Sequence, residues 1–378
     1  NVQPLISHRF DFEEAERAYQ VLSEEKSALG IILNYASEPV TRHVKEVSLS
    51  EASFDAQTPT VGFIGAGNYA SRMLIPAFKE NKAQLHTIVT AKGVSGVVHG
   101  KKSGFASAST DMDSMLANQA INTVAIVTRH NTHAPFVTKS LNAGKHVFVE
   151  KPLAITFESL AEVEAAYYAN TAGSKPQHLM VGYNRRFSPH IQKMKALLQS
   201  IHEPKSIVMV MNAGHISKEH WVQDEAIGGG RIIGEACHFI DLMLYLVGDE
   251  IISIQARKMG ETDALETTED KAAIMLGFKD GSFGTIHYLA NGAASFPKER
   301  IEVFAGAKVL QLDNFRKLKG FGWDNFKKMN LMKQDKGQRA CVGAFLSAIT
   351  HGHKTPIPIE EVFEVARVTL EAAQQLRQ

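Results

Sequence analysis

A glycine-rich stretch near residue 65 has the residue types and spacing of a phosphate-binding turn. It contains Gly65, Gly67, Asn68, Tyr69 and Ala70, directly after the apolar run TVGFI and before a segment with apolar residues on one face. Gly65 permits a tight turn, Gly67 lets the backbone approach a pyrophosphate, and Ala70 allows close packing of helix on strand. The N-terminus of the following helix would face the anion. The pattern predicts a dinucleotide site, and a purely structural turn is the alternative.

The end of the next predicted strand bears on which dinucleotide is bound. An acidic residue about 20 residues after the glycines would hold the ribose 2′-hydroxyl of NAD. Here the strand LHTIV is followed by Thr90, Ala91 and Lys92, with no Asp or Glu. A hydroxyl and a cation suit a 2′-phosphate, so we predict NADP in preference to NAD, with Thr90 and Lys92 as contacts. The alternative is that Lys92 is a solvated loop residue.

The elements that position these residues change character along the chain. From residue 59 strands and helices alternate, which is typical of a parallel α/β sheet. Beyond about residue 205 long strands lie close together, and Asp280-Gly281 is a hairpin-turn signal. The predicted fold class is α/β. A Rossmann dinucleotide-binding domain at 59–182 precedes an α+β domain at 183–378, with a large, open-faced, mostly antiparallel sheet and closing C-terminal helices.

Five motifs in a fixed order make the chain resemble the glucose–fructose oxidoreductase and inositol dehydrogenase family, Gfo/Idh/MocA. They read GAGNYA, TRHNTHA, AGKHVFVEKPLA, GYNRRFSP and GGGRIIGEACHFID. The resemblance covers essentially residues 59–378 and implies NAD(P)-linked chemistry on sugars, polyols or nucleotide sugars. Beyond the glycine turn, the cofactor contacts that it implies are Thr128, Arg129, Asn131, His133, Glu150, Lys151 and Arg186.

The resemblance also implies that Lys151, in the sequence Glu-Lys-Pro, is catalytic. A lysine at the carboxyl end of a Rossmann strand points into the crevice where such sheets bind ligands. It could hydrogen-bond the reacting hydroxyl and stabilise negative charge that develops on oxygen, or relay a proton if burial lowers its pKa. An ordinary surface Glu-Lys pair is the alternative.

His238 is the acid/base candidate by the same resemblance, because imidazole can exchange a proton near neutral pH. The family usually has an Asp at the position that matches Gly234, and this chain lacks it. We predict that Glu235, one residue further along the helix, replaces that Asp or orients the imidazole. A buried structural role is the alternative for His238.

Four further residues are expected to face the substrate: Tyr183, Arg185, Trp221 and Asp241. A tryptophan face suits stacking on a sugar ring, and Asp241 would have an orienting or packing role. For Arg186, a salt bridge between domains is an equal alternative to a ligand contact.

Residues 1–35 have the order strand, helix, strand and resemble the C-terminal tail of medium-chain zinc alcohol dehydrogenases. The likeness rests on His8, Arg9, Phe10, Ala15, Ala18 and Tyr19. We therefore interpret them as the remnant of an upstream enzyme in a bi-domain fusion, of a kind found with polysaccharide-synthesis enzymes. An ordinary N-terminal extension is the alternative. Residues 36–58 lack sustained periodicity and are predicted to be a linker.

The amino-acid composition restricts the classes of binding partner that we expect. The 41 Lys and Arg balance 40 Asp and Glu, which argues against nucleic acid and anionic membranes. No apolar run suggests a membrane span, and the two cysteines have no metal-ligand spacing, so we expect a cytoplasmic protein without a metal. An open sheet face carrying AIML and TIHY must be covered, which predicts a homodimer or homotetramer.

Taken together, these features predict hydride transfer between NAD(P) and a carbinol carbon of a sugar-like substrate. Two alternatives remain open at this point. One is a glycosidase or epimerase that uses bound NAD(P) without net redox change. The other is a non-catalytic NAD(P)-sensing regulator, which the absence of the usual Asp at Gly234 makes less remote.

Overall fold

The computed structural model describes residues 2–35, 44–171, 177–262 and 265–378, so residues 36–43 of the predicted linker lie outside the described residues. The chain divides into two compact units, Asn1–Glu46 and Val47–Gln378, and each is described by itself. In the described parts, no helix combines the length and apolar character needed to cross a membrane.

The N-terminal unit is a single strand–helix–strand motif. Strands β1 (His8–Asp11) and β2 (Ile31–Asn34) pair in parallel, and helix α1 (Ala15–Glu24) connects them. The order is the one predicted, although the first strand begins only at His8, because Gln3–Leu5 forms a 3-10 turn. Among its described apolar side chains, only Phe10 and Ala18 are buried. A motif that buries so little apolar surface has a very small core.

The first part of the larger unit is a seven-stranded sheet with the strand order β3-β6-β5-β4-β7-β8-β9. All pairings from β6 to β9 are parallel. The strands are β3 (Glu46–Ser48), β4 (Thr60–Ile64), β5 (Gln84–Val89), β6 (Ser107–Ser109), β7 (Thr123–Ile126), β8 (His146–Val149) and β9 (Leu179–Val181). The helices are α2 (Ile75–Glu80), α3 (Val94–Ser103), α4 (Met112–Ala117), α5 (His133–Asn142) and α6 (Phe157–Thr171). Strands β4, β7 and β9 are buried along their whole length, as expected of a sheet covered on both faces.

The predicted linker is shorter in the structure than in the prediction. Residues Glu46–Ser48 form β3 at the edge of the Rossmann sheet, beside β6. The Gln84 side-chain amide then donates to the Asp55 carbonyl at 2.7 Å, which holds the following segment against the domain. Short polar strands at a sheet edge carry little hydrophobic signal, so the pattern of residues 46–58 did not indicate this pairing.

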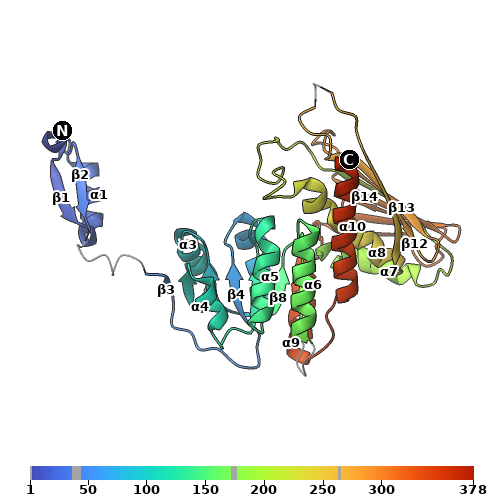
Figure 1. The fold of residues 1–378 in the computed structure, drawn as a ribbon, viewed down its shortest axis with the longest axis horizontal. Coiled ribbons are helices and arrows are strands. Elements are labelled where there is room, and N and C mark those ends of the chain that lie inside the picture. Colours follow the sequence, from blue (N-terminus) through green and yellow to red (C-terminus); the bar gives the residue numbers. More distant parts are fainter. Residues whose placement is uncertain (1, 36–43, 172–176, 263–264) are drawn as a thin grey trace. The chain divides into compact units, whose positions relative to one another are not determined.

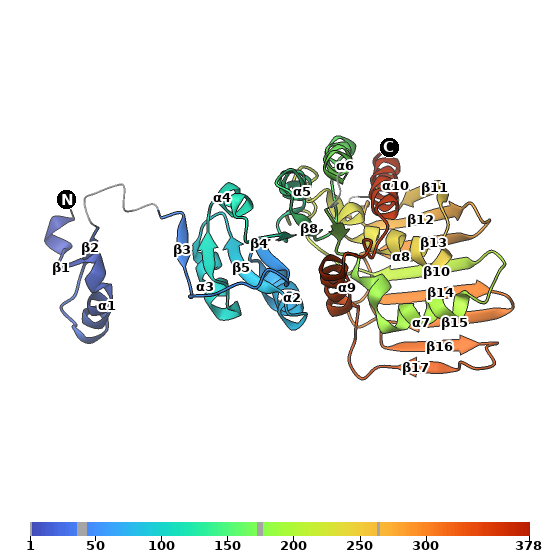
Figure 2. The same cartoon turned by 90° about the horizontal axis from the view of Figure 1, so that it is seen from below.

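The second part of the larger unit is an eight-stranded sheet with the order β11-β12-β13-β10-β14-β15-β16-β17. Figure 2 shows the strands in this order from top to bottom. Only the β10–β13 pair is parallel, and all the others are antiparallel. The strands are β10 (Ser206–Asn212), β11 (Ile251–Lys258), β12 (Lys271–Phe278), β13 (Phe283–Leu289), β14 (Glu299–Ala305), β15 (Lys308–Asp313), β16 (Lys317–Phe321) and β17 (Lys328–Asn330). The predicted hairpin joins β12 to β13, with Gly281 at φ 86°.

Helices cover one face of this sheet, and Figure 1 shows α8 and α10 between it and the Rossmann domain. The helices of this part are α7 (Pro189–Leu198), α8 (Cys237–Val247), α9 (Gln338–His351) and α10 (Ile359–Arg377). Helix α9 returns to the Rossmann domain, where the Phe345 ring lies 5.6 Å from that of Phe148. One continuous core therefore joins both parts of the larger unit. The predicted fold class is confirmed, and α9 ties the second domain firmly to the first.

Candidate active site

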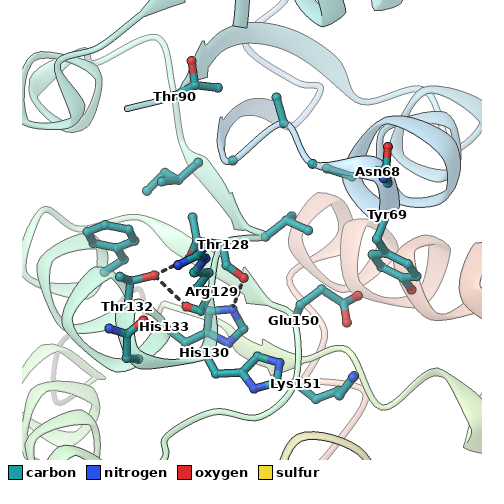
Figure 3. Close-up of a pocket in the computed structure, with 18 of the residues that line it drawn as sticks. Asn68, Tyr69, Thr90, Thr128, Arg129, His130, Thr132, His133, Glu150 and Lys151 are labelled. Atoms are coloured by element: carbon teal, nitrogen blue, oxygen red, sulfur yellow. Dashed lines mark hydrogen bonds between the residues drawn. The ribbon is translucent and has the colours of Figure 1, made fainter. Parts of the chain in front are cut away.

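A cavity of about 1330 Å³ lies between the carboxyl ends of the Rossmann strands and the sheet domain. Figure 3 shows the part of its wall that β4, β5, β7 and β8 supply. The strand order reverses at β4, and such switch points are where open α/β sheets bind ligands. Predicted site residues that line the cavity are Gly65, Gly67, Asn68, Tyr69, Ala70, Thr90, Thr128, Arg129, Asn131, His133, Glu150, Lys151, Arg185, Trp221, Glu235 and His238.

The glycine turn has the space and the conformation that a dinucleotide requires. Gly65 has φ 104°, and a Cβ on it would lie 2.4 Å from the Val127 carbonyl oxygen, so only glycine fits there. A Cβ on Gly67 would meet nothing within 4 Å, which leaves open space over its backbone. Ala70 is fully buried and begins a π-helical turn (Ala70–Leu74) that leads into α2. The residues present therefore fit the pyrophosphate of a dinucleotide.

Thr90 and Lys92 are separated by the structure. Thr90 lines the cavity at the end of β5, and its buried hydroxyl has no hydrogen-bond partner among the described residues. Lys92 is exposed and is not part of the cavity wall. Neighbouring wall residues from this region are Val89, Ala91, Ser95, Thr110 and Met112, none of which is acidic.

His133 connects the two strand ends that carry the site. Its Nδ1 lies 2.7 Å from the Pro152 carbonyl oxygen and its Nε2 lies 3.2 Å from that of Thr128. Figure 3 shows the bond to Thr128, together with those from the Thr132 hydroxyl to its neighbours. Burial lowers the pKa of His133 to about 4, so the ring is neutral at physiological pH. Both ring nitrogens face protein carbonyls, which makes His133 a positioning residue for the loops after β7 and β8.

Glu150 and Lys151 follow β8 and point into the cavity. Burial raises the pKa of Glu150 to about 7, against the opposing effect of the neighbouring Lys151 ammonium, and the Tyr69 hydroxyl donates to this carboxyl group. Lys151 Nζ donates to the Gly234 carbonyl at 2.8 Å. Its remaining N–H donors have no hydrogen-bond acceptor among the described residues. The bond to Gly234 holds the Rossmann strand end against the sheet-domain helix.

His238 lies at the start of α8 with its side chain buried. Its Nδ1 has no hydrogen-bond partner among the described residues, an arrangement that costs free energy unless a ligand or a water molecule supplies the partner. Burial, and then the positive charges of Arg185 and Lys151, hold the pKa of His238 well below its usual value. The imidazole is therefore neutral at physiological pH, and its protonated form is disfavoured unless a bound ligand offsets these positive charges.

Glu235 reaches the cavity from a π-helical turn (Ile232–Ala236), a feature frequent at functional sites. Its carboxylate accepts from Lys298 Nζ at 2.8 Å, from Arg231 Nη2 at 3.3 Å and from the Tyr288 hydroxyl. Burial alone would raise its pKa, but Lys298 and the other donors lower it to about 2. Glu235 is therefore a fixed negative charge, and this geometry favours an electrostatic role over proton transfer.

The space beside Gly234, where the family usually has an Asp, is filled by His130. A Cβ on Gly234 would lie 2.7 Å from His130 Cε1. His130 Nδ1 lies 2.7 Å from the Gly228 carbonyl oxygen, and its ring contacts Trp221 edge-on at 4.9 Å. Sequence reasoning did not select His130 as a site residue, and the only signal for it was its place within the motif TRHNTHA.

Arg186, Asp241 and Tyr183 lie outside the cavity wall. This placement differs from the predicted substrate contact of Tyr183, and it agrees with the salt-bridge alternative for Arg186 and the packing role for Asp241. Arg186 Nη2 lies 2.5 Å from Asp241 Oδ1, and its Nη1 lies 2.7 Å from Glu361. This buried ion pair joins the 3-10 turn Asn184–Phe187, α8 and α10. Tyr183 is buried with its ring 6.3 Å from that of His238. The sequence could not distinguish these packing roles from ligand contacts, because both place polar residues next to the same motifs.

Two lysines that the sequence gave no reason to select, Lys298 and Lys336, also line the cavity. Lys298 precedes β14 and Lys336 precedes α9, so they follow none of the motifs and reach the site only through tertiary folding. Within the described residues, no group of three or more His, Cys, Asp or Glu side chains could hold a metal ion.

Two family models match the chain. The model described as "Oxidoreductase family, NAD-binding Rossmann fold" matches residues 60–183, and the one described as "GFO/IDH/MocA C-terminal domain" matches residues 191–308. Together they account for more than half of the 378 residues.

Curated relatives include two dehydrogenases. The 1-carboxy-3-chloro-3,4-dihydroxycyclohexa-1,5-diene dehydrogenase of Comamonas testosteroni is 27% identical over 64% of this chain and 60% of its own length. The myo-inositol 2-dehydrogenase of Thermotoga maritima is 26% identical over 57% of this chain and 64% of its own length. The chain thus matches less than two thirds of either relative.

Solved structures share the fold over most of the chain. Levoglucosan dehydrogenase in complex with NADH and levoglucosan has a TM-score of 0.73 at 20% identity, over 84% of this chain and 97% of that one. An oxidoreductase from Agrobacterium radiobacter in complex with NAD+, L-tartaric acid and magnesium has a TM-score of 0.72 at 18% identity, over 85% of this chain and 97% of that one.

Proposed function

This chain belongs to the Gfo/Idh/MocA oxidoreductase family, and we propose that it is an NAD(P)-dependent dehydrogenase or reductase acting on a carbinol carbon of a sugar-like substrate. The observation that carries the proposal is the shared cavity. A glycine turn suited to a pyrophosphate, an ammonium group with free N–H donors and a neutral buried imidazole all line it.

The bound nicotinamide supplies the carbon that accepts or donates the hydride. In the direction of oxidation, Lys151 donates a hydrogen bond to the substrate hydroxyl oxygen and stabilises the negative charge that develops there. His238 accepts the hydroxyl proton as the C–H hydride departs, and in reduction it returns that proton. Glu235 balances the positive charge around the site without exchanging a proton.

For the cofactor, we propose NADP in preference to NAD. The support is the wall at the end of β5, where Thr90 and Ser95 offer hydroxyl groups and the neighbouring wall residues carry no carboxylate. A carboxylate at this point would repel a 2′-phosphate and would hold a 2′-hydroxyl. Lys92 is left out of the proposal because it does not line the cavity. A larger rise in melting temperature with NADPH than with NADH at equal concentration would support the choice.

We also propose that the open face of the large sheet is a homo-oligomer interface. Phe283 and Phe304 are paired in register with Ser206 of β10, so the two rings lie in one row across three strands. Both rings are exposed, as is Met275 on β12. Apolar side chains gathered on a bare sheet face are typical of protein interfaces. Sedimentation of the purified protein would show whether it is a dimer, a tetramer or a monomer.

Lys151→Met and His238→Asn test the proposed catalytic roles. We expect each to lower kcat for nicotinamide-linked turnover by about 100-fold or more, because each removes a group that acts on the transferring proton or on developing charge. Turnover is followed by nicotinamide absorbance over a panel of sugars, polyols and nucleotide sugars. Lys101→Met, an exposed lysine on α3, is the matched control and should retain activity. Unchanged turnover in Lys151→Met would contradict the assignment.

A further inference from the structure

Four cationic side chains surround His238 in the cavity. They are Lys151, Arg185, Lys298 and Lys336, and the positive charge of each lowers the pKa of the imidazole. They come from four separate places: the end of β8, the turn before α7, the start of β14 and the start of α9. Such convergence from distant parts of the chain builds a site of one charge sign.

The carboxylates near these cations are too few to balance them. Glu235 accepts from Lys298, and Glu299 accepts from both Arg185 and Lys336, at 3.0 Å and 2.6 Å. The third carboxyl group, Glu150, has its pKa raised to about 7 by burial, so it is only partly charged near neutrality. Asp241 also interacts with Arg185, but it is paired with Arg186, so the described residues leave a positive excess around His238.

Besides Lys151, whose free N–H donors are assigned to the carbinol, Lys298 and Lys336 have N–H donors free to take up a ligand. The Arg185 guanidinium is occupied by a bidentate pair with Glu299, with both distances 3.0 Å. Lys298 and Lys336 each donate one hydrogen bond to a carboxylate, and an ammonium group has three N–H donors. The Lys298 side chain is 43% exposed and the Lys336 side chain 16%.

The pyrophosphate of a cofactor does not account for this excess. The glycine turn that suits a pyrophosphate follows β4, whereas Arg185, Lys298 and Lys336 belong to the sheet domain. Figure 3 shows Lys151 at the opposite end of the drawn wall from Thr90. Oxidised nicotinamide adds a further positive charge beside the reacting carbon, which favours an anionic group in the other ligand. Charges partly withdrawn from water are stabilised when such a partner binds.

We propose that the substrate carries an anionic oxygen group, a carboxylate or a phosphate, bound by Lys298 and Lys336 while its carbinol faces Lys151 and His238. The substrate class is then a sugar acid or a sugar phosphate and not a neutral sugar or polyol. This inference rests on the proposed function and specifies the substrate of the same site.

The test measures binding to the protein saturated with NADPH, using matched pairs of probes. D-Glucuronate and D-glucose 6-phosphate are each compared with D-glucose, and D-galacturonate with D-galactose, by titration of nicotinamide fluorescence and by calorimetry. We expect at least one acidic probe to bind about 10- to 100-fold more tightly than its neutral partner, as for a charge-assisted pair. The carboxylate and phosphate probes show which group is preferred. The preference should weaken with added salt.

Variants locate the anion site. Lys298→Met and Lys336→Met should each remove most of the acidic preference, measured as the ratio of the Kd values of the acidic and neutral probes for the same variant. Both should fold, because Glu235 keeps Arg231 and Tyr288 as partners and Glu299 keeps Arg185. Lys101→Met should leave the preference intact. Three results would overturn the inference: neutral probes that bind as tightly as acidic ones, no binding of any acidic probe, or an acidic preference that survives in a variant carrying both Lys298→Met and Lys336→Met.

Turnover recorded on the same probes, with NADP+ in place of NADPH as the hydride acceptor, separates the two proposals. Preferential binding of acids without hydride transfer would support the anion site and count against the proposed function. Turnover of neutral sugars without any preference for acidic probes would support the proposed function and count against the anion site.

Discussion

At the scale of single residues, Gly234 and His130 form a matched pair. The His130 ring occupies the space next to Gly234, its Nδ1 is held by the Gly228 carbonyl, and burial lowers its pKa to about 3. The usual Asp of the family therefore cannot simply be restored here. The site instead places Glu235, one residue later, in contact with Lys298.

Gly234→Asp should destabilise the protein and reduce its activity. The new Cβ would lie 2.7 Å from His130 Cε1, and crowding of this kind costs about 1–3 kcal/mol of unfolding free energy. His130→Ala makes room, so the double variant should be more stable than the sum of the two single changes predicts. Urea unfolding of all four proteins measures the coupling. Additive effects would show that the two positions do not share this space.

At the scale of elements, the sequence predicted the features that depend on neighbouring residues, namely the strands and the motifs that directly follow them. Strands such as β4 and β7 are continuous apolar runs, and the glycine turn and the Glu-Lys-Pro motif directly follow strands, so their meeting at one sheet edge was predictable. The contacts of Lys298 and Lys336 were not, because only tertiary folding brings them to His238. The edge strand β3 escaped prediction for a similar reason, because it depends on a partner far along the chain. For Arg186 the sequence left a salt bridge and a ligand contact as equal alternatives, and it could not name Asp241 as the partner.

The Arg186 ion pair is assigned here to the packing of elements and not to ligand binding. Arg186→Met should lower the unfolding free energy by about 3–5 kcal/mol, because it leaves Asp241 buried without its partner. The affinity of the remaining folded protein for NADPH should change little. Urea unfolding and a fluorescence titration measure the two quantities. A large loss of affinity for NADPH with an unchanged free energy of unfolding would contradict this prediction and would indicate that Arg186 binds the cofactor.

At the scale of the whole molecule, buried neutral histidines make the fold sensitive to acid. Burial lowers the pKa from 6.5 to about 3 for His130 and to about 4 for His133 and His146. The unfolded chain takes up protons below pH 6.5 while the folded chain does not, so stability present above that pH is lost as pH falls toward 4. Glu150 and Asp241 have the opposite sign, because burial raises their pKa values to about 7 and about 6, which favours the folded state as pH falls.

The free energy of unfolding should therefore be lower at pH 5 than at pH 7. Each of the three histidines can contribute up to about 2 kcal/mol between pH 6.5 and pH 5. Glu150 and Asp241 together offset less than about two of these contributions. Urea unfolding at the two pH values measures the difference. In His146→Asn the side-chain oxygen can still accept a hydrogen bond from the His178 amide. This variant should show a smaller difference in unfolding free energy between the two pH values, by about the contribution of one histidine. Equal or greater stability at pH 5 would contradict this account.

The most direct test of the central claim is mass spectrometry of the small molecules released when the purified protein is denatured. We expect the wild-type protein to release a bound nicotinamide dinucleotide. Because the cavity wall at Thr90 carries no carboxylate, we expect this dinucleotide to be NADP(H). Gly67→Ala should lose it while remaining folded, because the new methyl group enters open space over the turn. NAD(H) in its place would correct the cofactor and keep the reaction. If no nicotinamide is released and none raises the melting temperature, the oxidoreductase assignment is contradicted.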